Sequence, residues 1–336
     1  MKKIWIAWER QRRSVELANH FKCNVFFITK WNKYWFRLVG CTIATIITIR
    51  KQKPDILFVQ NPSIFLAAIC CFLKPFFSYV LVVDRHSNFK FEHRNSINPK
   101  WCIFHLLSKY TLKKSDFTIV TNKYLKKYIV NQGATALVLS DKIPDLKTKN
   151  IQVKSNPNKK RLSAFVISSF QKDEPYEEIF HAAKNHPDIT FIFSGNYKKV
   201  ISPREISNLP KNVVLAGFIT ESEYAEMLSI ADFTLVFTKH EFILNCGSYE
   251  SISAGKPMIL SNTITIRNFF KKGAIYCEEL TGRGISEAIT QMKENLGRLN
   301  EEIRHEKPRL KNAWETEVGI ALSDIDQFVN SKMHKD

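Results

Sequence analysis

The sequence predicts an α/β protein with two Rossmann-like, doubly wound parallel sheets facing a cleft. Short runs of β-branched and aromatic residues alternate with segments of helical periodicity, which is the pattern of a parallel sheet. The alternation stops once, in a polar stretch near the middle of the chain, and then restarts. A length of 336 residues also suits two domains better than one core. We therefore expect a first domain over residues 1–150, a second over 151–318, and a terminal helix over 319–336 that packs back on the first.

In the first half, apolar runs bounded by polar residues predict the strands, and segments with apolar residues on one side predict the helices between them. The expected strands are 4–7, 25–28, 55–59, 79–83, 117–120 and 136–139. The expected helices are 13–21, 35–50, 63–72, 99–112 and 123–131. Residues 64–83 are mostly apolar, but Lys74 and Pro75 interrupt them, so a buried helix followed by a buried strand fits better than a membrane span.

The second half begins after residues 146–161, which are polar and nearly without periodicity and therefore predict a linker. Strands are expected at 163–167, 190–193, 213–216, 233–236, 258–260 and 274–276. Helices are expected at 176–184, 221–230, 248–254, 284–296 and 308–331. In two such sheets joined by a linker, ligands prefer the cleft between the domains.

Charge is divided unevenly between the two halves. Residues 1–150 contain 26 Lys and Arg against 8 Asp and Glu, whereas residues 151–336 contain 24 of each. A one-sided basic surface attracts nucleic acid, anionic lipid or phosphorylated substrates. No RNP, zinc-finger or helix-turn-helix signature is present, so we expect no nucleic-acid partner; a basic nucleic-acid-binding protein is the alternative.

Several common sites are excluded by missing motifs. The chain has no GxGxxG after its first strand, no P-loop, no GxSxG and no HExxH. Its DxD, Asp324 to Asp326, falls on the terminal helix, so we expect no bound metal. Seven cysteines without framework spacing, with Cys70 and Cys71 inside an apolar run, predict buried thiols in a reducing compartment. The first residues do not read as a signal peptide, and we expect a cytoplasmic protein.

The segment 231–257 carries the most chemical information. It predicts a strand, a loop and a helix whose start holds Gly247, taken as the N-cap, and whose end is Gly255. The amides of residues 246–248 at such a helix start can bind a phosphate. Glu250 is positioned either to accept hydrogen bonds from a ribose diol or to cap the helix. Glu241 is either a functional residue of the loop or a solvated carboxylate.

This segment resembles the donor-binding motif of retaining GT-B glycosyltransferases of family four, in which two glutamates flank a loop before a helix. Glu250 matches the second glutamate. The usual spacing places the first glutamate at Phe242, and Glu241 stands one residue earlier. The resemblance implies a GT-B fold and transfer of a sugar from a UDP- or GDP-sugar co-substrate to a glycan acceptor. It also implies retention at the anomeric carbon, with neither metal nor cofactor.

The resemblance also assigns roles to residues at strand ends and helix starts. The implied donor-binding residues are Ser168, Ser169, Lys172, Gly195, Asn196, Cys246, Gly247, Ser248 and Glu250. The implied acceptor-binding residues are Arg13, Ser14, Gln60 and Asn61. The implied catalytic residues are His86, Asp84 and Glu241. His86 lies nearest the reaction, and Asp84 orients its imidazole or binds an acceptor hydroxyl; satisfied structural residues are the alternative at both positions.

Other segments of the chain resemble a polysaccharide-assembly branch of the superfamily. This resemblance implies a lipid-linked glycan acceptor in the synthesis of capsule, exopolysaccharide or O-antigen. We then expect the basic first domain to lie on an anionic membrane surface, peripheral on the inner face of the cell membrane. The expected anchors are the lysines of two predicted helices and four aromatic residues, namely Lys109, Lys113, Lys114, Lys123, Lys126 and Lys127 with Trp31, Trp35, Phe36 and Trp101. A GT-B-like protein that binds without catalysing is the alternative.

Overall fold

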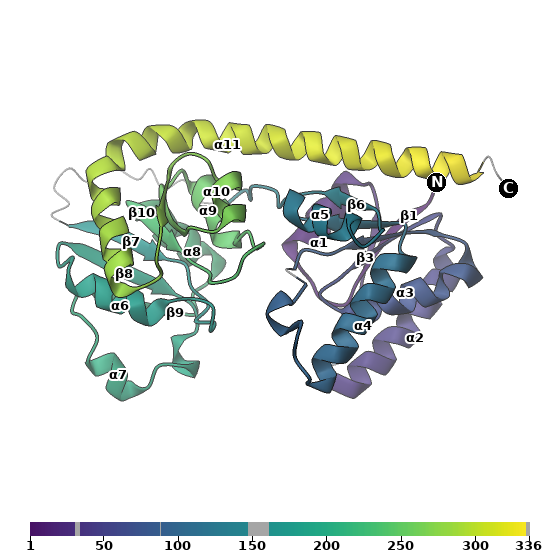
Figure 1. Ribbon diagram of the computed structural model, residues 1–336, viewed down its shortest axis with the longest axis horizontal. Coiled ribbons are helices and arrows are strands. Elements are labelled where there is room, and N and C mark those ends of the chain that lie inside the picture. Colours follow the sequence, from purple (N-terminus) through teal and green to yellow (C-terminus); the bar gives the residue numbers. More distant parts are fainter. Residues whose placement is uncertain (31–33, 88, 147–160, 334–336) are drawn as a thin grey trace. The chain divides into compact units, whose positions relative to one another are not determined.

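The computed structural model describes residues 1–30, 34–87, 89–146 and 161–333 (Figure 1). The chain divides into two compact units. Unit 1 comprises Met1–Lys142 together with Ala313–Asp336, and unit 2 comprises Ile143–Asn312. The linker predicted over residues 146–161 lies almost wholly outside the described residues.

Unit 1 contains a six-stranded sheet in which every strand pair is parallel. Its strands are β1 (Lys3–Ala7), β2 (Asn24–Phe27), β3 (Ile56–Gln60), β4 (Val80–Asp84), β5 (Phe117–Val120) and β6 (Ala136–Val138). Their order is β2-β1-β3-β4-β5-β6, so the direction of winding reverses between β1 and β3. Ligands of open α/β sheets bind at such a reversal, outside the carboxyl ends of the strands.

Helices cover both faces of this sheet. The helices of unit 1 are α1 (Arg12–His20), α2 (Tyr34–Gln52), α3 (Ile64–Phe77), α4 (Pro99–Lys114), α5 (Lys123–Val130) and the 3₁₀ turn η1 (Phe91–His93). Residues of α2, α3 and α4 pack with β1, β3 and β4 in one apolar core. Residues of α1 and of the end of α11 (Gly282–Met333) pack in a second core with the same strands.

A helix, α3, followed by a strand, β4, confirms the predicted order; the strand is fully buried, whereas the helix is buried on one side and exposes Phe72 and Phe76. The helix is longer than predicted because it continues past Pro75 to Phe77. Proline removes one helical N–H, and so near a carboxyl end it costs a single hydrogen bond of the last turns. Among the described helices, none combines the length and apolar character that a membrane crossing requires.

Unit 2 contains a second six-stranded parallel sheet. Its strands are β7 (Leu162–Val166), β8 (Ile189–Ser194), β9 (Val213–Gly217), β10 (Phe233–Val236), β11 (Met258–Ser261) and β12 (Ala274–Cys277). Their order is β12-β11-β10-β7-β8-β9, so the reversal of winding falls between β10 and β7. The core of this sheet is rich in phenylalanine, including Phe165, Phe191, Phe193 and Phe233.

The helices of unit 2 are α6 (Tyr176–Lys184), α7 (Pro203–Ser207), α8 (Glu221–Ile230), α9 (Cys246–Ala254), α10 (Ile264–Phe269), the first part of α11 and the 3₁₀ turn η2 (Tyr197–Lys199). Helices α6 and α8 begin and end at the predicted residues. Helices α7 and α10 were not predicted, since five and six residues are too few to show helical periodicity.

Helix α11 corrects the prediction of two separate helices over 284–296 and 308–331. It is one helix from Gly282 to Met333 and contains Pro308. Leu299, Ile303 and Leu310 are buried, so the apolar face continues through the segment expected to be a loop. Glu306 is fully buried and paired with Arg309 at 2.6 Å, which stabilises the turns on both sides of the proline.

Candidate functional site

The reversal point of unit 2 brings the start of α9 against the end of β7. A Cβ at Gly247 would lie 2.7 Å from Cγ2 of Ile167, the residue that follows β7. Real Cβ atoms do not approach other atoms so closely, so a side chain here would force the helix start away from the strand. Gly247 therefore allows the amino end of a helix to sit at the crevice where α/β folds bind ligands.

The N-cap of α9 is Asn245, which corrects the prediction that Gly247 caps the helix. Asn245 makes no side-chain hydrogen bond to the first turn. Its Oδ1 atom and the Oγ atom of Ser248 are buried, and neither has a hydrogen-bond partner among the described residues. Buried polar atoms are nearly always paired in folded proteins, so an unpaired cluster at a helix start is a feature of a ligand site.

Glu250 lies on the fifth residue of α9, half-buried. It is therefore beyond the N3 position, and the capping interpretation of this residue is wrong. Its Oε2 atom accepts a hydrogen bond from the hydroxyl of Tyr224 on α8, at 2.5 Å. Tyr224 fixes the carboxylate from a neighbouring helix, a role that no spacing in the sequence indicates.

The turn after β7 holds Ser168, Ser169 and Lys172, as predicted for a donor-binding loop, but its polar groups already have an acceptor. The carboxylate of Glu174 accepts from Ser168 Oγ at 2.7 Å and from Ser169 N and Oγ at 2.9 Å each. Lys172 is exposed in the same turn. Glu174 thus sets the shape of this turn, and sequence reasoning did not single it out.

Gly195 and Asn196 follow β8, next to this turn. Gly195 has a φ of 99°, and a Cβ there would lie 2.1 Å from the carbonyl oxygen of Ser168. This glycine therefore allows the end of β8 to approach the end of β7. Asn196 is exposed, and at the end of β9 the side chain of Phe218 is 90% exposed. The carboxyl ends of β7, β8 and β9 thus form one polar edge with an exposed aromatic ring.

Glu241 is engaged elsewhere. Its carboxylate accepts from the amides of Ile264 and Thr265, at 3.0 and 2.9 Å, at the start of α10. Burial by itself raises the pKa of Glu241, but these hydrogen bonds outweigh burial and lower it. The structure therefore uses Glu241 to anchor the loop between β10 and α9 to the next helix, a task different from the predicted catalytic one.

In unit 1, the carboxyl end of β4 carries a buried charge network around Asp84. Arg13 donates to both oxygens of Asp84, to Oδ1 of Asp141 at 2.8 Å, and to the carbonyl oxygens of Leu139 and Ser140. All five N–H groups of this guanidinium are thereby committed to the protein. Arg13 thus positions Asp84, and it has no N–H left for the acceptor contact that was predicted.

His86 belongs to the same network. Its Nδ1 atom lies 3.3 Å from Oδ2 of Asp84, and its side chain is 20% exposed. Burial alone raises the pKa of Asp84, but the Arg13 guanidinium and the His86 contact outweigh burial and hold that pKa at about 2. An ionised Asp84 orients the imidazole so that Nε2 points away from the carboxylate. Asp84 therefore contacts the imidazole, and its orienting role in the reaction stays a prediction.

The other predicted acceptor residues, Ser14, Gln60 and Asn61, line the reversal point of this sheet and are buried. The Asn61 amide donates to the carbonyl oxygen of Asp84 at 2.8 Å, and Gln60 Oε1 accepts from Glu9 N at 3.3 Å. Ser14 Oγ and Gln60 Nε2 are buried without a hydrogen-bond partner in the described part of the chain. Buried polar atoms without a described hydrogen-bond partner therefore lie at the reversal point of unit 1, as they do in unit 2.

Sequence reasoning overlooked Arg85, which follows Asp84. Its side chain is 1% exposed, lies 3.7 Å from the ring centre of Phe89 and donates to Ser108 Oγ at 2.8 Å. Burial lowers the pKa of Arg85 to about 9. An arginine in a loop is usually exposed, and nothing local in the sequence shows that this one is enclosed.

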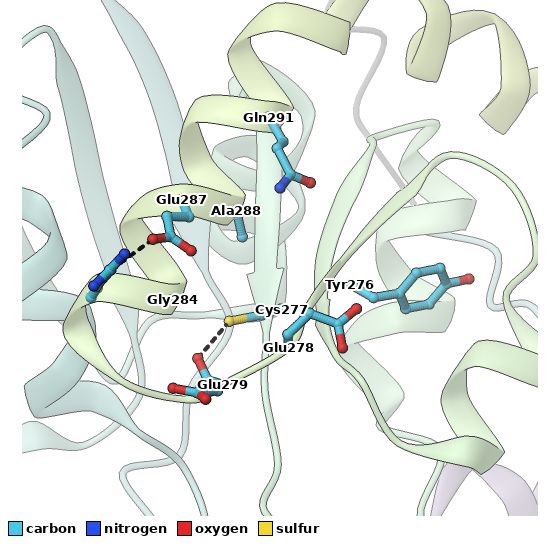
Figure 2. Close-up of a pocket in the computed structure, with 9 residues that line it drawn as sticks. Tyr276, Cys277, Glu278, Glu279, Gly284, Glu287, Ala288 and Gln291 are labelled. Carbon is cyan, nitrogen blue, oxygen red and sulfur yellow. Dashed lines mark hydrogen bonds and ion pairs between the residues drawn. The ribbon is translucent and has the colours of Figure 1, made fainter.

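A separate hollow of about 330 Å³ opens at the end of β12 and the start of α11 (Figure 2). Glu287 pairs with Arg283 at 2.8 Å along its rim, and Cys277 Sγ contacts the carbonyl oxygen of Glu279 at 3.0 Å. β12 is the edge strand of the sheet, with β11 and β10 between it and the reversal point. This acidic hollow is thus not part of the site that α9 and β7 form.

Metal-binding clusters are absent from the part of the chain that the structure describes: no group of three His, Cys, Asp or Glu residues is placed to hold an ion. The DxD lies on helix α11, where the sequence predicted it. One of its carboxylates, Asp326, pairs with Lys3 at 3.1 Å.

Comparison with solved structures identifies the fold of this chain. No protein-family model and no curated protein matches the sequence. Among solved structures, sucrose-phosphate synthase from Thermosynechococcus elongatus aligns over 100% of both chains at 12% identity, with a TM-score of 0.78. HepE from Anabaena, in complex with UDP and glucose, aligns over 98% of this chain and 100% of its own at 11% identity, with a TM-score of 0.71.

A glycosyltransferase from Rickettsia africae aligns over 100% of this chain and 91% of its own, at 11% identity and a TM-score of 0.65. Identities this low show the shared fold and not the shared reaction. The fold is GT-B, with two α/β units that each contain a six-stranded parallel sheet, and this confirms the predicted fold class.

Proposed function

We propose that this protein is a glycosyltransferase that moves a sugar from a nucleoside-diphosphate donor to an acceptor hydroxyl. The observation that carries the proposal is the start of α9 at the reversal point of unit 2. Gly247 packs there against Ile167, Ser248 presents a buried, unpaired hydroxyl, and Glu250 is held by Tyr224. The HepE structure of the same fold contains UDP and glucose, which favours a UDP-sugar as the donor.

In this proposal unit 2 binds the donor. The diphosphate meets the first turn of α9 at residues 246–248, where the helix dipole and the amides favour negative charge. Lys172 on the exposed turn after β7 adds a cation, and Glu250 accepts hydrogen bonds from the ribose. Gly195 and Asn196 line the nucleotide at the end of β8. The same groups stabilise the charge that develops on the departing diphosphate.

In this proposal, residues of unit 1 bind the acceptor and contact the reacting sugar. The bond from the anomeric carbon to the diphosphate oxygen breaks and its electron pair leaves with the diphosphate, while a bond from the anomeric carbon to the acceptor oxygen forms. The proton of the acceptor hydroxyl passes to the departing diphosphate. His86, oriented by Asp84 and Arg13, offers Nε2 as a hydrogen-bonding group to the sugar or the acceptor. Retention at the anomeric carbon and independence from metal belong to this proposal through the resemblance to family-four enzymes.

We extend the proposal to the acceptor and the pathway. The excess of 26 Lys and Arg over 8 Asp and Glu lies in residues 1–150, which form most of the acceptor unit. A lipid-linked glycan on the inner face of the cell membrane fits such a basic surface, because anionic headgroups attract it. Capsule, exopolysaccharide or O-antigen synthesis is the pathway class in which such acceptors occur.

The experiment compares three proteins by calorimetric titration with UDP- and GDP-sugars: wild type, Glu250→Ala and Glu226→Ala. Glu226 is an exposed glutamate on α8, so its substitution makes the same change of charge next to the site. We expect wild type and Glu226→Ala to bind one donor class alike. Glu250→Ala should bind at least about tenfold more weakly, since it loses about 1.5–3 kcal/mol of charged hydrogen bonding.

Unchanged donor affinity in Glu250→Ala contradicts the donor site. If no sugar nucleotide binds, a second titration with DNA and RNA at two salt concentrations tests the alternative. Affinity for nucleic acid that falls steeply with salt identifies a nucleic-acid-binding protein instead.

A further inference from the structure

We propose that the outer surface of α2, α3 and α4 is the face by which this protein docks on an anionic lipid membrane. This apolar helix face consists of Phe36, Val39, Ile43, Ile47, Phe72, Phe76, Ile103 and Leu106. The inference rests on the proposed function only in that a lipid-linked acceptor gives the docking a purpose. The surface itself is argued from exposure, hydrogen bonding and charge.

Helix α2 contributes an apolar stripe to solvent. Phe36, Val39, Ile43 and Ile47 are 69, 58, 53 and 58% exposed. Their spacing of three or four residues places them on one side of the helix, one turn after another. The outward side of a surface helix is normally polar, and a contiguous apolar patch of this kind marks a contact surface for a protein or a membrane.

The polar groups of α2 are satisfied within the helix. The hydroxyls of Thr42, Thr45 and Thr48 each donate to the carbonyl oxygen four residues earlier, at 2.7 Å. Residues 38–49 contain no Asp, Glu, Lys or Arg. Removing this stripe from water therefore leaves no threonine hydroxyl unpaired and buries no charge.

Helices α3 and α4 extend the stripe into a face. Figure 1 shows α2, α3 and α4 on the same side of the unit-1 sheet, and α3 contacts both of the others. Phe72 and Phe76 on α3 are 64 and 70% exposed, with their ring centres 5.9 Å apart. Ile103 and Leu106 on α4 are 50 and 68% exposed.

The charges on these helices indicate which kind of partner the apolar helix face binds. The sequences of α2, α3 and α4 contain no Asp or Glu. Arg37 and Lys74 pair with Glu9 and Asp116 at 3.0 and 2.6 Å. The other cationic residues of these helices are Arg50, Lys51, Lys100, Lys109, Lys113 and Lys114. Anionic headgroups attract cations near the membrane surface by about 1 kcal/mol each, while the apolar side chains enter the interface. A second copy of this chain would oppose cations to cations, so a membrane is the better occupant.

This face differs from the anchors expected from the sequence. Phe36 and the lysines Lys109, Lys113 and Lys114 belong to both sets. Trp31 lies outside the described residues, and Trp35 is in α2 with a side chain that is not described. Trp101 is half-buried and stacked on His93 at 3.9 Å, so it is partly occupied within the protein. The exposed apolar residues of α2 and α3 were missed because hydrophobic periodicity shows that a helix has an apolar side. It does not show whether that side faces the core or the solvent.

The test is flotation of the full chain with two kinds of vesicle, phosphatidylcholine alone and phosphatidylcholine with phosphatidylglycerol. The variant carries Ile43→Asp and Ile47→Asp, which place two carboxylates at the centre of the α2 stripe. The control is Ile320→Asp on α11, which is 57% exposed and belongs to the same unit. We expect wild type and control to float with anionic vesicles and the double variant to lose at least about tenfold in partitioning, which is about 1.4 kcal/mol.

Three results overturn the inference: wild type that floats with neither vesicle, equal flotation of the double variant, or equal loss in the control. Sedimentation that shows a dimer dissociated by the double variant overturns it too, because the face is then an interface between copies. Thermal unfolding of both variants shows that each is folded. Donor titration is performed separately without vesicles, so failure to bind sugar nucleotides contradicts the proposed function and leaves the docking result intact.

Discussion

Asp84 is a fully buried carboxylate whose charge depends on one residue far away in the sequence. Arg13 and Asp84 form a paired contact at 2.9 Å, with Asp141 on the other side of the guanidinium. A buried ion without its partner is strongly unfavourable, so the pair is maintained as a unit. Sequence reasoning located Asp84, His86 and Arg13 separately. It assigned Arg13 to an acceptor because nothing in the spacing shows that its N–H groups point at Asp84.

The network predicts an acid-dependent loss of stability. The pKa of Asp84 is about 2 in the folded protein and 3.8 in a free chain, so protonation favours the unfolded state. The stabilisation is fully present above the pKa of Asp84 in the unfolded chain. It is lost as the pH falls toward the pKa of Asp84 in the folded protein. When the pH is lowered from about 5 to about 3, protonation of this carboxylate should reduce the unfolding free energy of wild type by about 1 kcal/mol.

Urea unfolding of wild type and Asp84→Asn over this pH range is the measurement. The variant should be less stable near neutral pH and lose less on acidification, because it has no proton to gain at this position. Parallel pH profiles for the two proteins would show that Asp84 is not held ionised by Arg13.

The residues around the proposed donor site show where prediction from sequence stops. Glycines at strand ends and helix starts were recognisable, and the contacts of Gly195 and Gly247 with the residues after β7 give their physical reason. The partners were not recognisable. Tyr224 comes from another helix, and Glu241 binds amides of α10, which is too short to be predicted. Side-chain pairing between elements depends on packing that a single sequence does not encode locally.

At the scale of elements, alternation along the chain was sufficient for every strand of both sheets, because each is short, apolar and bounded by polar residues. The long helix was mispredicted as two helices, with Pro308 taken as the start of the second. Its carboxyl part supplies Trp314, Val318, Ala321, Ile325 and Val329 to the core of unit 1. The carboxyl part of α11 therefore folds with unit 1, although the helix begins in unit 2.

Trp314 anchors the carboxyl part of this helix in the core of unit 1. It is 2% exposed, donates from Nε1 to the carbonyl oxygen of Ser140 at 3.1 Å and meets His20 edge-on at 4.5 Å. Trp314→Ala should therefore lower the unfolding free energy of unit 1 by about 3–5 kcal/mol, the usual cost of deleting a buried aromatic side chain.

Chemical denaturation of Trp314→Ala beside Ile320→Ala is the measurement. Ile320 lies on the exposed side of the same helix, so its truncation should change stability by about 0.5 kcal/mol or less. Equal effects of the two substitutions would mean that the end of α11 does not pack in the core of unit 1.

The two units of the molecule have separate apolar cores, and they differ in their balance of basic and acidic residues. Among the residues that the structure describes, the cores around β1, β3 and β4 contain none of unit 2, and the cores around β7 and β10 contain none of unit 1. Most of the basic excess falls in unit 1, which the first half of the sequence supplies. We therefore expect two unfolding transitions in calorimetry, one for each unit.

Donor binding should act on one of these transitions alone. A ligand stabilises the unit that holds its site by RT ln(1 + [L]/Kd), about 2.7 kcal/mol when its concentration is a hundred times the Kd. UDP should thus raise the transition of unit 2, where α9 and β7 form the proposed site, and leave that of unit 1 in place. Trp314→Ala identifies the unit-1 transition, because it lowers that one. If UDP instead raises the transition that Trp314→Ala lowers, the nucleotide binds to unit 1 and the assignment of the donor to α9 is wrong.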